Sequence, residues 1–222
     1  MRELKNRLKT IESLVPKGAR VADIGTDHGH LPISLVRSKI ATKVIACDIN
    51  EKPLANAKDN IEKTATENVE LRLGDGLAPI KPKEVDCVII AGMGGEVIAG
   101  ILENCYFIKD ESYTLLLQPM TSADFLRKYL CKNGYSFVSE TAVAEGKRIY
   151  TVIKAVYCGE KSECSEAFYL CGKLDPKDDT ARLYIEKQQK IALKALTDLK
   201  NNNMDYSHYE ELYNDITKIL GE

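Results

Sequence analysis

The sequence lacks any apolar run near the ~20 residues that a membrane-spanning helix requires. It also lacks an excess of charge, because 31 Lys and Arg side chains stand against 33 Asp and Glu, for a net charge of −2. This balance gives no global sign of nucleic-acid binding. The charged segment Met1–Lys9 has no apolar stretch of the signal-peptide kind. With 44% hydrophobic and 29% charged residues, we expect a globular cytoplasmic protein.

Metal-binding and redox cysteine patterns are absent too. None of the seven cysteines stands in a CxxC pair, so neither a zinc ribbon nor a redox pair is indicated. Cys47, Cys87 and Cys158 lie within apolar runs, and we expect them to be reduced and to pack as small hydrophobic side chains. His28 and His30 form an HxH pair without a third ligand nearby in sequence, so we expect no metal site.

Apolar runs and helical stripes alternate along the first two thirds of the chain. Strands are expected at residues 20–24, 43–48, 69–73, 85–91, 113–118, 135–144 and 148–157. Helices are expected at residues 30–39, 51–63, 96–104 and 122–132. This alternation predicts an α/β fold with a mostly parallel sheet covered on both faces. The last two strands follow each other directly, so they predict an antiparallel hairpin at one edge.

The composition changes after Tyr157. Residues 159–177 resemble a loop, and two stripes with coiled-coil spacing follow on either side of residues 201–203. Their members are Ile185, Gln189, Ala192, Leu196 and Leu199, then Tyr206, Tyr209, Tyr213, Ile216 and Leu220. We therefore expect a sheet domain, residues 1–158, and a C-terminal antiparallel helical hairpin, residues 159–222. The hairpin is either a lid packed on the sheet or an arm that binds a partner.

A glycine turn between the first strand and the first helix, Asp23–Pro32, is the most informative segment. In an open α/β sheet, ligands bind at this position. The segment has neither the GxGxxG spacing of dinucleotide sites nor the Gly-Lys-Ser/Thr of a phosphate loop. Asp23 and Asp27 flank the turn and would repel a pyrophosphate. They suit a positively charged ligand such as S-adenosylmethionine, which has an ammonium and a sulfonium group.

Acidic residues also follow the next two strands. Asp48 ends the second strand, where a carboxylate can accept from both ribose hydroxyls. Asp75 lies between two glycines after the third strand, where it can accept from the adenine amino group. One acid at such a place is commonly a helix cap. Carboxylates at three successive strand ends instead predict an S-adenosylmethionine site.

The fourth and fifth strands lead to the acceptor side of such a site. The fourth runs into Gly92, Met93, Gly94, Gly95 and Glu96, whose glycines leave bare backbone for a flat ring to approach. Methyltransferases of exocyclic amino groups usually carry Asp/Asn-Pro-Pro-aromatic here, which this chain lacks. The fifth strand ends in Gln118, Pro119 and Met120 at the same rim.

Three segments together resemble the TrmK family of bacterial tRNA adenine-N1 methyltransferases, which act on adenine 22. They are Asp23–Pro32 (DIGTDHGHLP), Ala91–Gly95 (AGMGG) and Leu117–Met120 (LQPM). The resemblance covers essentially the whole chain and implies a Rossmann-like class I methyltransferase sheet with a C-terminal coiled coil. It also implies that Arg7 meets the methionine carboxylate of the cofactor. The expected cofactor contacts are Arg7, Asp23, Gly25, Thr26, Asp27, His28, Gly29, Asp48, Ile49, Asp75, Gly76, Gly92 and Met93.

Adenine N1 already carries an in-plane lone pair, so the main catalytic task is to position it against the methyl group. The target base must be unstacked or extruded from its helix. Because the methylated product is cationic, a nearby carboxylate would favour it as charge develops. Asp27 is the candidate for this catalytic role, with Glu96 behind it.

Substrate contacts are expected at the rim and on basic side chains. Gly94, Gly95, Gln118, Pro119 and Met120 are expected to meet the adenine, and Lys187, Lys190 and Lys194, on one helix face, to meet phosphates. Further basic candidates are Arg2, Lys5, Arg7, Lys9, Lys17, Arg20, Lys81, Lys83, Arg127, Lys128, Lys132, Lys147 and Arg148. Basic side chains outnumber acidic ones only in the first part of the chain. Residues 1–158 hold 22 basic and 20 acidic side chains, whereas residues 159–222 hold 9 basic and 13 acidic ones.

We expect a monomer that binds tRNA and no membrane. Two other functions stay open from the residues alone. One is methylation of a small molecule or a protein, and the other is a non-catalytic nucleotide-sensing or RNA-binding module with the same fold. The glycine spacing and the acids disfavour an NAD-dependent oxidoreductase.

Overall fold

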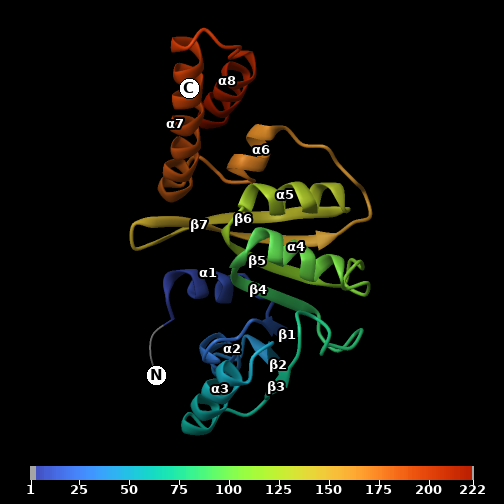
Figure 1. Cartoon of the computed structure of the whole chain (residues 1–222). Coiled ribbons are helices and arrows are strands. Elements are labelled where there is room, and N and C mark those ends of the chain that lie inside the picture. The colour runs from blue at the N-terminus through green and yellow to red at the C-terminus, as the bar shows by residue number, and fades with distance from the viewer. Residues whose placement is uncertain (1–3, 222) are drawn as a thin grey trace.

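A seven-stranded sheet in the order β3-β2-β1-β4-β5-β7-β6 forms the centre of the computed structural model, which describes residues 4–221 (Figure 1). The strands are β1 (Ala19–Ile24), β2 (Ala41–Asp48), β3 (Val69–Leu73), β4 (Cys87–Gly94), β5 (Thr114–Thr121), β6 (Tyr135–Glu145) and β7 (Arg148–Tyr157). β1 to β5 are parallel to one another, and β7 is antiparallel to both β5 and β6. The predicted α/β sheet with an antiparallel hairpin at one edge is confirmed.

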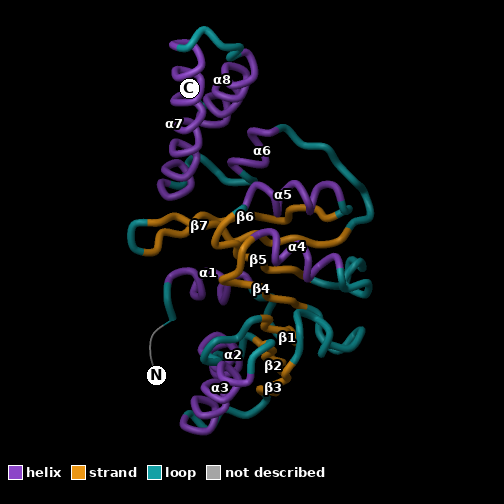
Figure 2. Tube along the Cα trace, in the orientation of Figure 1, coloured by secondary structure: helices purple, strands orange, loops and turns teal. Residues whose placement is uncertain are grey.

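Helices connect the parallel strands, except β3 and β4, and cover both faces of the sheet (Figure 2). They are α1 (Asn6–Leu14), α2 (His30–Arg37), α3 (Glu51–Lys63), α4 (Gly95–Glu103), α5 (Ala123–Lys132), α6 (Glu166–Cys171), α7 (Asp179–Asn201) and α8 (Ser207–Leu220). Successive strand residues face opposite sides. Ile89 and Leu116 pack with α1 and α2, whereas Ile90 and Leu117 pack with α4 and α5. This two-sided burial explains why the central strands are continuous apolar runs.

The helices α7 and α8 form an antiparallel hairpin that stands beyond the edge strand β6 (Figure 1). The hairpin has its own small core, in which Ile185, Ala192 and Ile216 are buried. Gln189 belongs to the predicted stripe and donates from Nε2 to Thr217 Oγ1 across the hairpin at 2.9 Å. The predicted helical hairpin is therefore present. The division of the chain into domains at residue 158 stays a prediction.

Two expectations for the C-terminal region are wrong. α6 lies inside the segment predicted as loop, because the Ser165 side chain accepts from the Phe168 amide at 3.2 Å and caps a short helix. Tyr206 precedes α8 and is 38% exposed, with its ring centroid 4.4 Å from Lys200 Nζ. Leu212, which was not in the predicted stripe, is buried on the inner face of α8 instead.

The cysteines are free thiols in the described part of the chain. Cys47 and Cys87 are buried as expected. Cys158 is exposed, contrary to expectation, because it follows the last residue of β7 and leaves the sheet. The fold also brings two distant thiols together, since the sulfurs of Cys131 and Cys164 lie 2.9 Å apart.

Candidate active site

A cavity of about 380 Å³ opens at the carboxyl ends of β1 and β4, beside α1 and the start of α2. This volume falls within the range of about 300–1,000 Å³ that is usual for small-molecule sites. Its lining comprises Leu4, Lys5, Arg7, Leu8, Asp23, Gly25, Thr26, Asp27, His28, Gly29, His30, Leu31, Ala91 and Gly92. Much of the predicted cofactor set, from α1, the glycine turn and β4, thus lines one cavity.

The glycine turn is held against the second strand by its backbone. The amides of Gly25 and Thr26 both donate to the Cys47 carbonyl, at 2.8 and 2.9 Å. Gly25 has φ +81°, which L side chains rarely adopt, and a Cβ there would collide with the Met93 methyl group. Asn60 Nδ2 donates to the His28 carbonyl at 2.9 Å and ties the turn to α3. The turn is therefore fixed before any ligand binds.

Asp23 is a buried acid in the lining of this cavity, with 6% of its surface exposed. Burial raises the pKa of its carboxyl group to about 6; a hydrogen bond from Thr26 opposes this shift and the charge of Asp48 adds to it. A carboxylate in this position is stabilised by a cation that enters the cavity. Asp23 therefore offers an acidic partner to an ammonium group in the cavity.

The remaining predicted cofactor residues lie outside the lining of this cavity. Asp48 accepts from the Asn50 amide at 2.8 Å, and the side chain of Ile49 is 61% exposed beside it. Asp75 and Gly76 line a second cavity, of about 560 Å³, between the turn after β3 and α4. The structure thus brings the predicted amino-acid end of the site together. It leaves the predicted nucleoside contacts spread along the ends of β2 and β3.

Arg7 links the cavity to the edge hairpin. Its Nη1 donates to Gln118 Oε1, which also accepts from the Gly92 amide at 3.2 Å. Its Nε lies 3.2 Å from Glu145 Oε2, and its guanidinium lies 5.3 Å from the centre of the Tyr150 ring. Nε is buried, and its contact with Glu145 is an ion pair that does not count as a hydrogen bond; Nε has no hydrogen bond to any described residue.

The two candidate catalytic acids differ in position. Asp27 lines the cavity and is exposed, with Oδ2 3.4 Å from Nε2 of His28. Glu96 is exposed in the first turn of α4 and is not among the residues that line the cavity. Of the two acids, Asp27 is therefore the one that lines the cavity.

Gly92, Gly94 and Gly95 differ in what lies at the place where a Cβ would stand. Gly92 has φ +82° with open space where a Cβ would stand, so bare backbone faces the cavity here. At Gly94 a Cβ would lie 3.3 Å from Thr121 Oγ1. Gly95 is buried, and a Cβ there would collide with the Ser122 carbonyl. The glycine at position 95 is thus required by the packing of α4 against the end of β5.

The predicted substrate residues Pro119, Met120 and Lys187 share a separate cleft of about 210 Å³ between the sheet and α7. Gln118 is fully buried behind it and binds Arg7, and its Nε2 donates to the Pro119 carbonyl at 2.8 Å. Lys190 and Lys194 are exposed farther along α7. Of the three lysines predicted to contact phosphates, Lys187 is therefore the one that lines this cleft.

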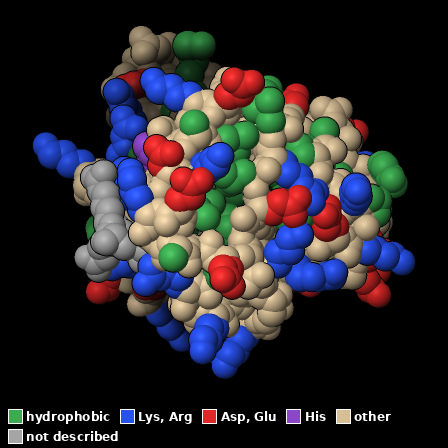
Figure 3. All heavy atoms as spheres, turned by 90° about the horizontal axis from the view of Figure 1, so that it is seen from below, with side chains coloured by type: hydrophobic (Ala, Val, Ile, Leu, Met, Phe, Trp, Pro, Cys, Tyr) green, Lys and Arg blue, Asp and Glu red, His purple; other side chains and the backbone are tan. Residues whose placement is uncertain are grey.

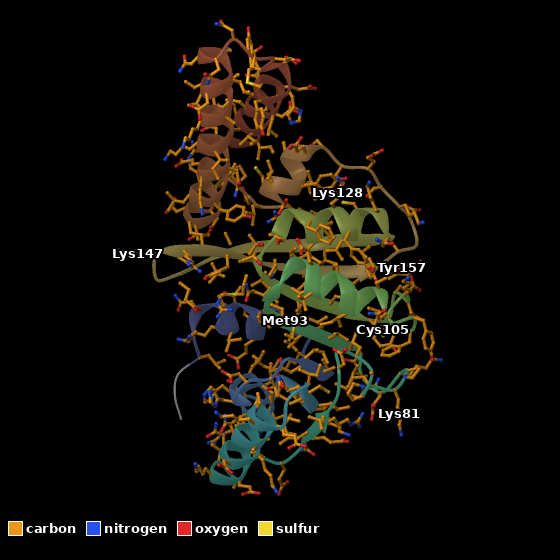
Figure 4. All side chains as sticks on the ribbon, viewed as in Figure 1. Lys81, Met93, Cys105, Lys128, Lys147 and Tyr157 are labelled. Atoms are coloured by element: carbon orange, nitrogen blue, oxygen red, sulfur yellow. The ribbon has the colours of Figure 1, made fainter. Side chains whose placement is uncertain are left out.

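Several predicted phosphate contacts are wrongly placed or lie outside the described residues. Arg127 is fully buried and bound to Glu140, so it cannot reach a phosphate. Lys147, at the tip of the β6–β7 hairpin, lies on the side of the molecule where α1 lies, whereas Lys81 lies on the opposite side (Figure 4). Arg2 is outside the described residues. Viewed from the end of the molecule below α3 and β3, Lys and Arg side chains are spread around the margin of the face (Figure 3).

Three residues that position the site were not predicted: Asn60, Glu145 and Tyr150. Asn60 was not singled out because it lies among the polar residues of a helix, although its side-chain amide can donate to a backbone carbonyl. Glu145 and Tyr150 stand near the tip of the edge hairpin and meet α1 only in the folded chain. No local pattern signals contacts that span more than a hundred residues.

No helix within residues 4–221 is both long and apolar enough to cross a bilayer. The same residues contain no group of three or more His, Cys, Asp and Glu side chains placed to hold a metal ion.

Comparison with known proteins finds methyltransferases among the relatives of this chain. Residues 4–153 match a methyltransferase domain family. The tRNA (adenine(22)-N(1))-methyltransferase of Bacillus subtilis (strain 168) is 39% identical over 158 residues, 70% of this chain and 66% of that protein. A putative tRNA methyltransferase of Mycoplasma pneumoniae is 32% identical over 155 residues, 68% of this chain and 70% of that protein.

Solved structures extend the similarity to the helical hairpin. The crystal structure of the B. subtilis m1A22 tRNA methyltransferase TrmK superposes with a TM-score of 0.77 at 30% identity, covering 99% of this chain and 96% of that one. M. capricolum TrmK in complex with S-adenosylhomocysteine gives a TM-score of 0.81 at 29% identity, covering 99% of both chains. The chain therefore belongs to the methyltransferase domain family and, within it, to the TrmK family.

Proposed function

We propose that this chain transfers the methyl group of S-adenosylmethionine to N1 of an adenine in tRNA, the reaction named for its B. subtilis relative at adenine 22. The observation that carries the proposal is a pair of opposite charges in one cavity. Asp23 and Arg7 both line it, one an acid and the other a guanidinium. This pair matches the ammonium and carboxylate of the methionine moiety.

The residues present fit this cofactor. The Asp23 carboxylate is buried and gains a partner when it accepts from an ammonium group. Arg7 Nε is ion-paired with Glu145 at 3.2 Å and makes no hydrogen bond within the described chain, so a carboxylate ligand would share this guanidinium with Glu145. Asp48 is the proposed acceptor for the ribose hydroxyls and Asp75 for the adenine amino group. When bound, S-adenosylmethionine supplies an electrophilic methyl group.

The protein's catalytic contribution is proposed to be positioning. Adenine N1 needs no base, so orienting it toward the cavity is the main task. The bare backbone of Gly92 lies at the cavity edge and admits a flat ring closely. Asp27 is exposed in the same lining, where its carboxylate would favour the cationic product. Glu96, from the start of α4, is the weaker candidate.

The tRNA is proposed to lie across the hairpin tip and the start of the helical arm, α7 and α8. Lys147 and Arg148 at the tip, together with Lys187, Lys190 and Lys194 on α7, are the proposed phosphate contacts. The helical arm is then a substrate-binding element of a C-terminal domain, residues 159–222. We propose that the protein acts as a monomer in the cytoplasm, where its tRNA substrate is found.

The test is incubation with radiolabelled S-adenosylmethionine and unmodified bacterial tRNA, followed by digestion and identification of the labelled nucleoside. The proposal predicts label in N1-methyladenosine. Label in another nucleoside would leave the cofactor assignment in place and contradict the target. Cofactor binding without label in any RNA would contradict the reaction and favour a non-RNA acceptor or a non-catalytic role.

A further inference from the structure

The cleft between the sheet and the helical arm is built from elements that are far apart in the sequence. Its lining includes Asp124, Tyr150, Thr151, Tyr184, Lys187 and Gln188. The carboxyl end of β5 and the first turn of α5 form one side. The start of β7, the end of α6 and the first half of α7 form the rest. In Figure 1 the start of α7 lies next to the β6–β7 hairpin.

A thin wall separates this cleft from the cofactor cavity. Tyr150 lines the cleft, and its ring centre lies 5.3 Å from the guanidinium of Arg7, which lines the cavity. Gln118 closes the wall, because it accepts from Arg7 and Gly92 on the cavity side and is followed by Pro119 on the cleft side. A group in the cleft is therefore separated from the cavity by the Tyr150 ring.

The cleft is held in shape by one fully buried cation. Arg127 donates to three of the residues that line it, each from a different element: Nη1 to the Leu170 carbonyl at 3.0 Å, and Nη2 to Thr151 Oγ1 at 3.3 Å and Tyr184 Oη at 3.4 Å. A cleft fixed in this way needs little rearrangement to accept a ligand, and so loses little conformational entropy on binding.

We infer that this cleft is a nucleotide subsite, which holds the tRNA nucleotide adjacent to the target adenine. The inference rests on the proposed function. The target itself must reach the cavity edge at Gly92, so the group on the far side of Tyr150 is its neighbour along the strand. The rings of Tyr150 and Tyr184 offer aromatic surface to a base, and Lys187 offers a cation to its phosphate. Asp124 and Gln188 add hydrogen-bonding groups for the base edge.

The experiment combines abasic tRNA with protein variants. Intact tRNA and tRNAs with an abasic nucleotide on either side of the target are tested for KM and, by anisotropy, for Kd. The wild-type protein is expected to lose about tenfold in affinity for one of the two abasic tRNAs, since base stacking and contacts are lost. Asp124→Ala and Gln188→Ala are expected to reduce that loss to about threefold or less, because the groups proposed to meet the base edge are gone.

Lys190→Ala is the matched control on the same helix. This variant is expected to bind intact and abasic tRNAs more weakly by the same factor. The tenfold difference between them should remain, since Lys190 is outside the cleft lining. All three replaced side chains are solvent-accessible, and cofactor affinity is expected to stay unchanged in each variant. The inference is overturned if both abasic tRNAs bind like intact tRNA, or if the difference persists undiminished in Asp124→Ala and Gln188→Ala. The Kd values test the subsite even if the protein does not methylate the tRNA. Failure to methylate intact tRNA would contradict the proposed function and not the subsite.

Discussion

Arg127 and Glu140 form an ion pair from which water is excluded: Nη2 lies 2.7 Å from Oε1, and neither side chain is exposed. The pair joins α5 to β6, and Arg127 also donates to the carbonyls of Tyr169 and Leu170 at the end of α6. The amide of Lys173 in turn donates to Glu140 Oε2 at 2.9 Å. This arrangement attaches the connection between sheet and helical arm to the sheet itself.

Arg127→Met is expected to destabilise the protein by about 3–5 kcal/mol, because it leaves the Glu140 charge buried without a partner. Chemical denaturation measures the change. Lys132→Met, at an exposed position in the last turn of the same helix, is the control and should cost less than about 1 kcal/mol. Equal losses in the two variants would show that the buried pair is not what holds this junction.

Asp23→Asn is expected to stabilise the fold while abolishing cofactor binding. The pKa of Asp23 is about 6 in the folded protein and 3.8 in the reference state. The native state therefore binds more protons than the unfolded state between these values, and the free energy of unfolding falls as pH rises through them. Above pH 6 the ionised acid costs roughly 3 kcal/mol, at about 1.4 kcal/mol per pKa unit.

Denaturation of the wild-type protein and Asp23→Asn from pH 4 to pH 8 measures this effect. The variant is expected to gain stability relative to the wild type as pH rises, and to match it near pH 4. Calorimetric titration with S-adenosylmethionine should find no binding to the variant at neutral pH. A variant that binds the cofactor normally at neutral pH would remove Asp23 from the site.

Gly25→Ala tests the close approach of the turn to the cofactor cavity. Gly18 is the matched control, because both glycines have φ +81° and only Gly25 has a neighbour, Met93, where a Cβ would stand. Both variants should lose about 1–2 kcal/mol of stability from the left-handed conformation. Only Gly25→Ala is expected to lose affinity for S-adenosylmethionine. Equal cofactor affinity in the two variants would contradict the placement of the cavity.

Asp27→Ala is expected to lower kcat about 10- to 100-fold at saturating cofactor, because the carboxylate that favours the cationic product is gone. The KM for S-adenosylmethionine should change much less. Steady-state kinetics with each substrate varied in turn separates the two effects. An unchanged kcat would restrict Asp27 to binding, and Glu96→Ala in the same assay would then test the alternative acid.

Patterns that depend on neighbours in sequence predicted most of the fold. The apolar runs through Ile89–Ile90 and Leu116–Leu117 identified the strands, and the glycine turn identified the cavity. Both signals are local, because a tight turn and a strand buried on both faces each depend on the residues of one segment. Arg127 was misassigned to the surface because its partner Glu140 belongs to the following strand. Burial of a charge depends on a partner that only the tertiary fold supplies.

The site was predicted in part for the same reason. Asp23, Gly25, Thr26 and Gly29 come from one segment, so their common lining followed from the motif. The contact of Arg7 with Glu145 and Tyr150 joins α1 to the far end of the sheet, and sequence spacing carries no information about it. The cleft formed with α7 depends on how the arm is set against β6, which the stripe on α7 alone does not specify.

Primer extension on tRNA treated with the protein and S-adenosylmethionine tests the central claim most directly. A methyl group on N1 occupies the Watson–Crick edge of adenine and blocks reverse transcription. The account predicts a stop at adenine 22 that appears with the wild-type protein and is absent with Asp23→Asn. A stop at another nucleotide, or full-length extension of tRNA that has taken up methyl label, would contradict it.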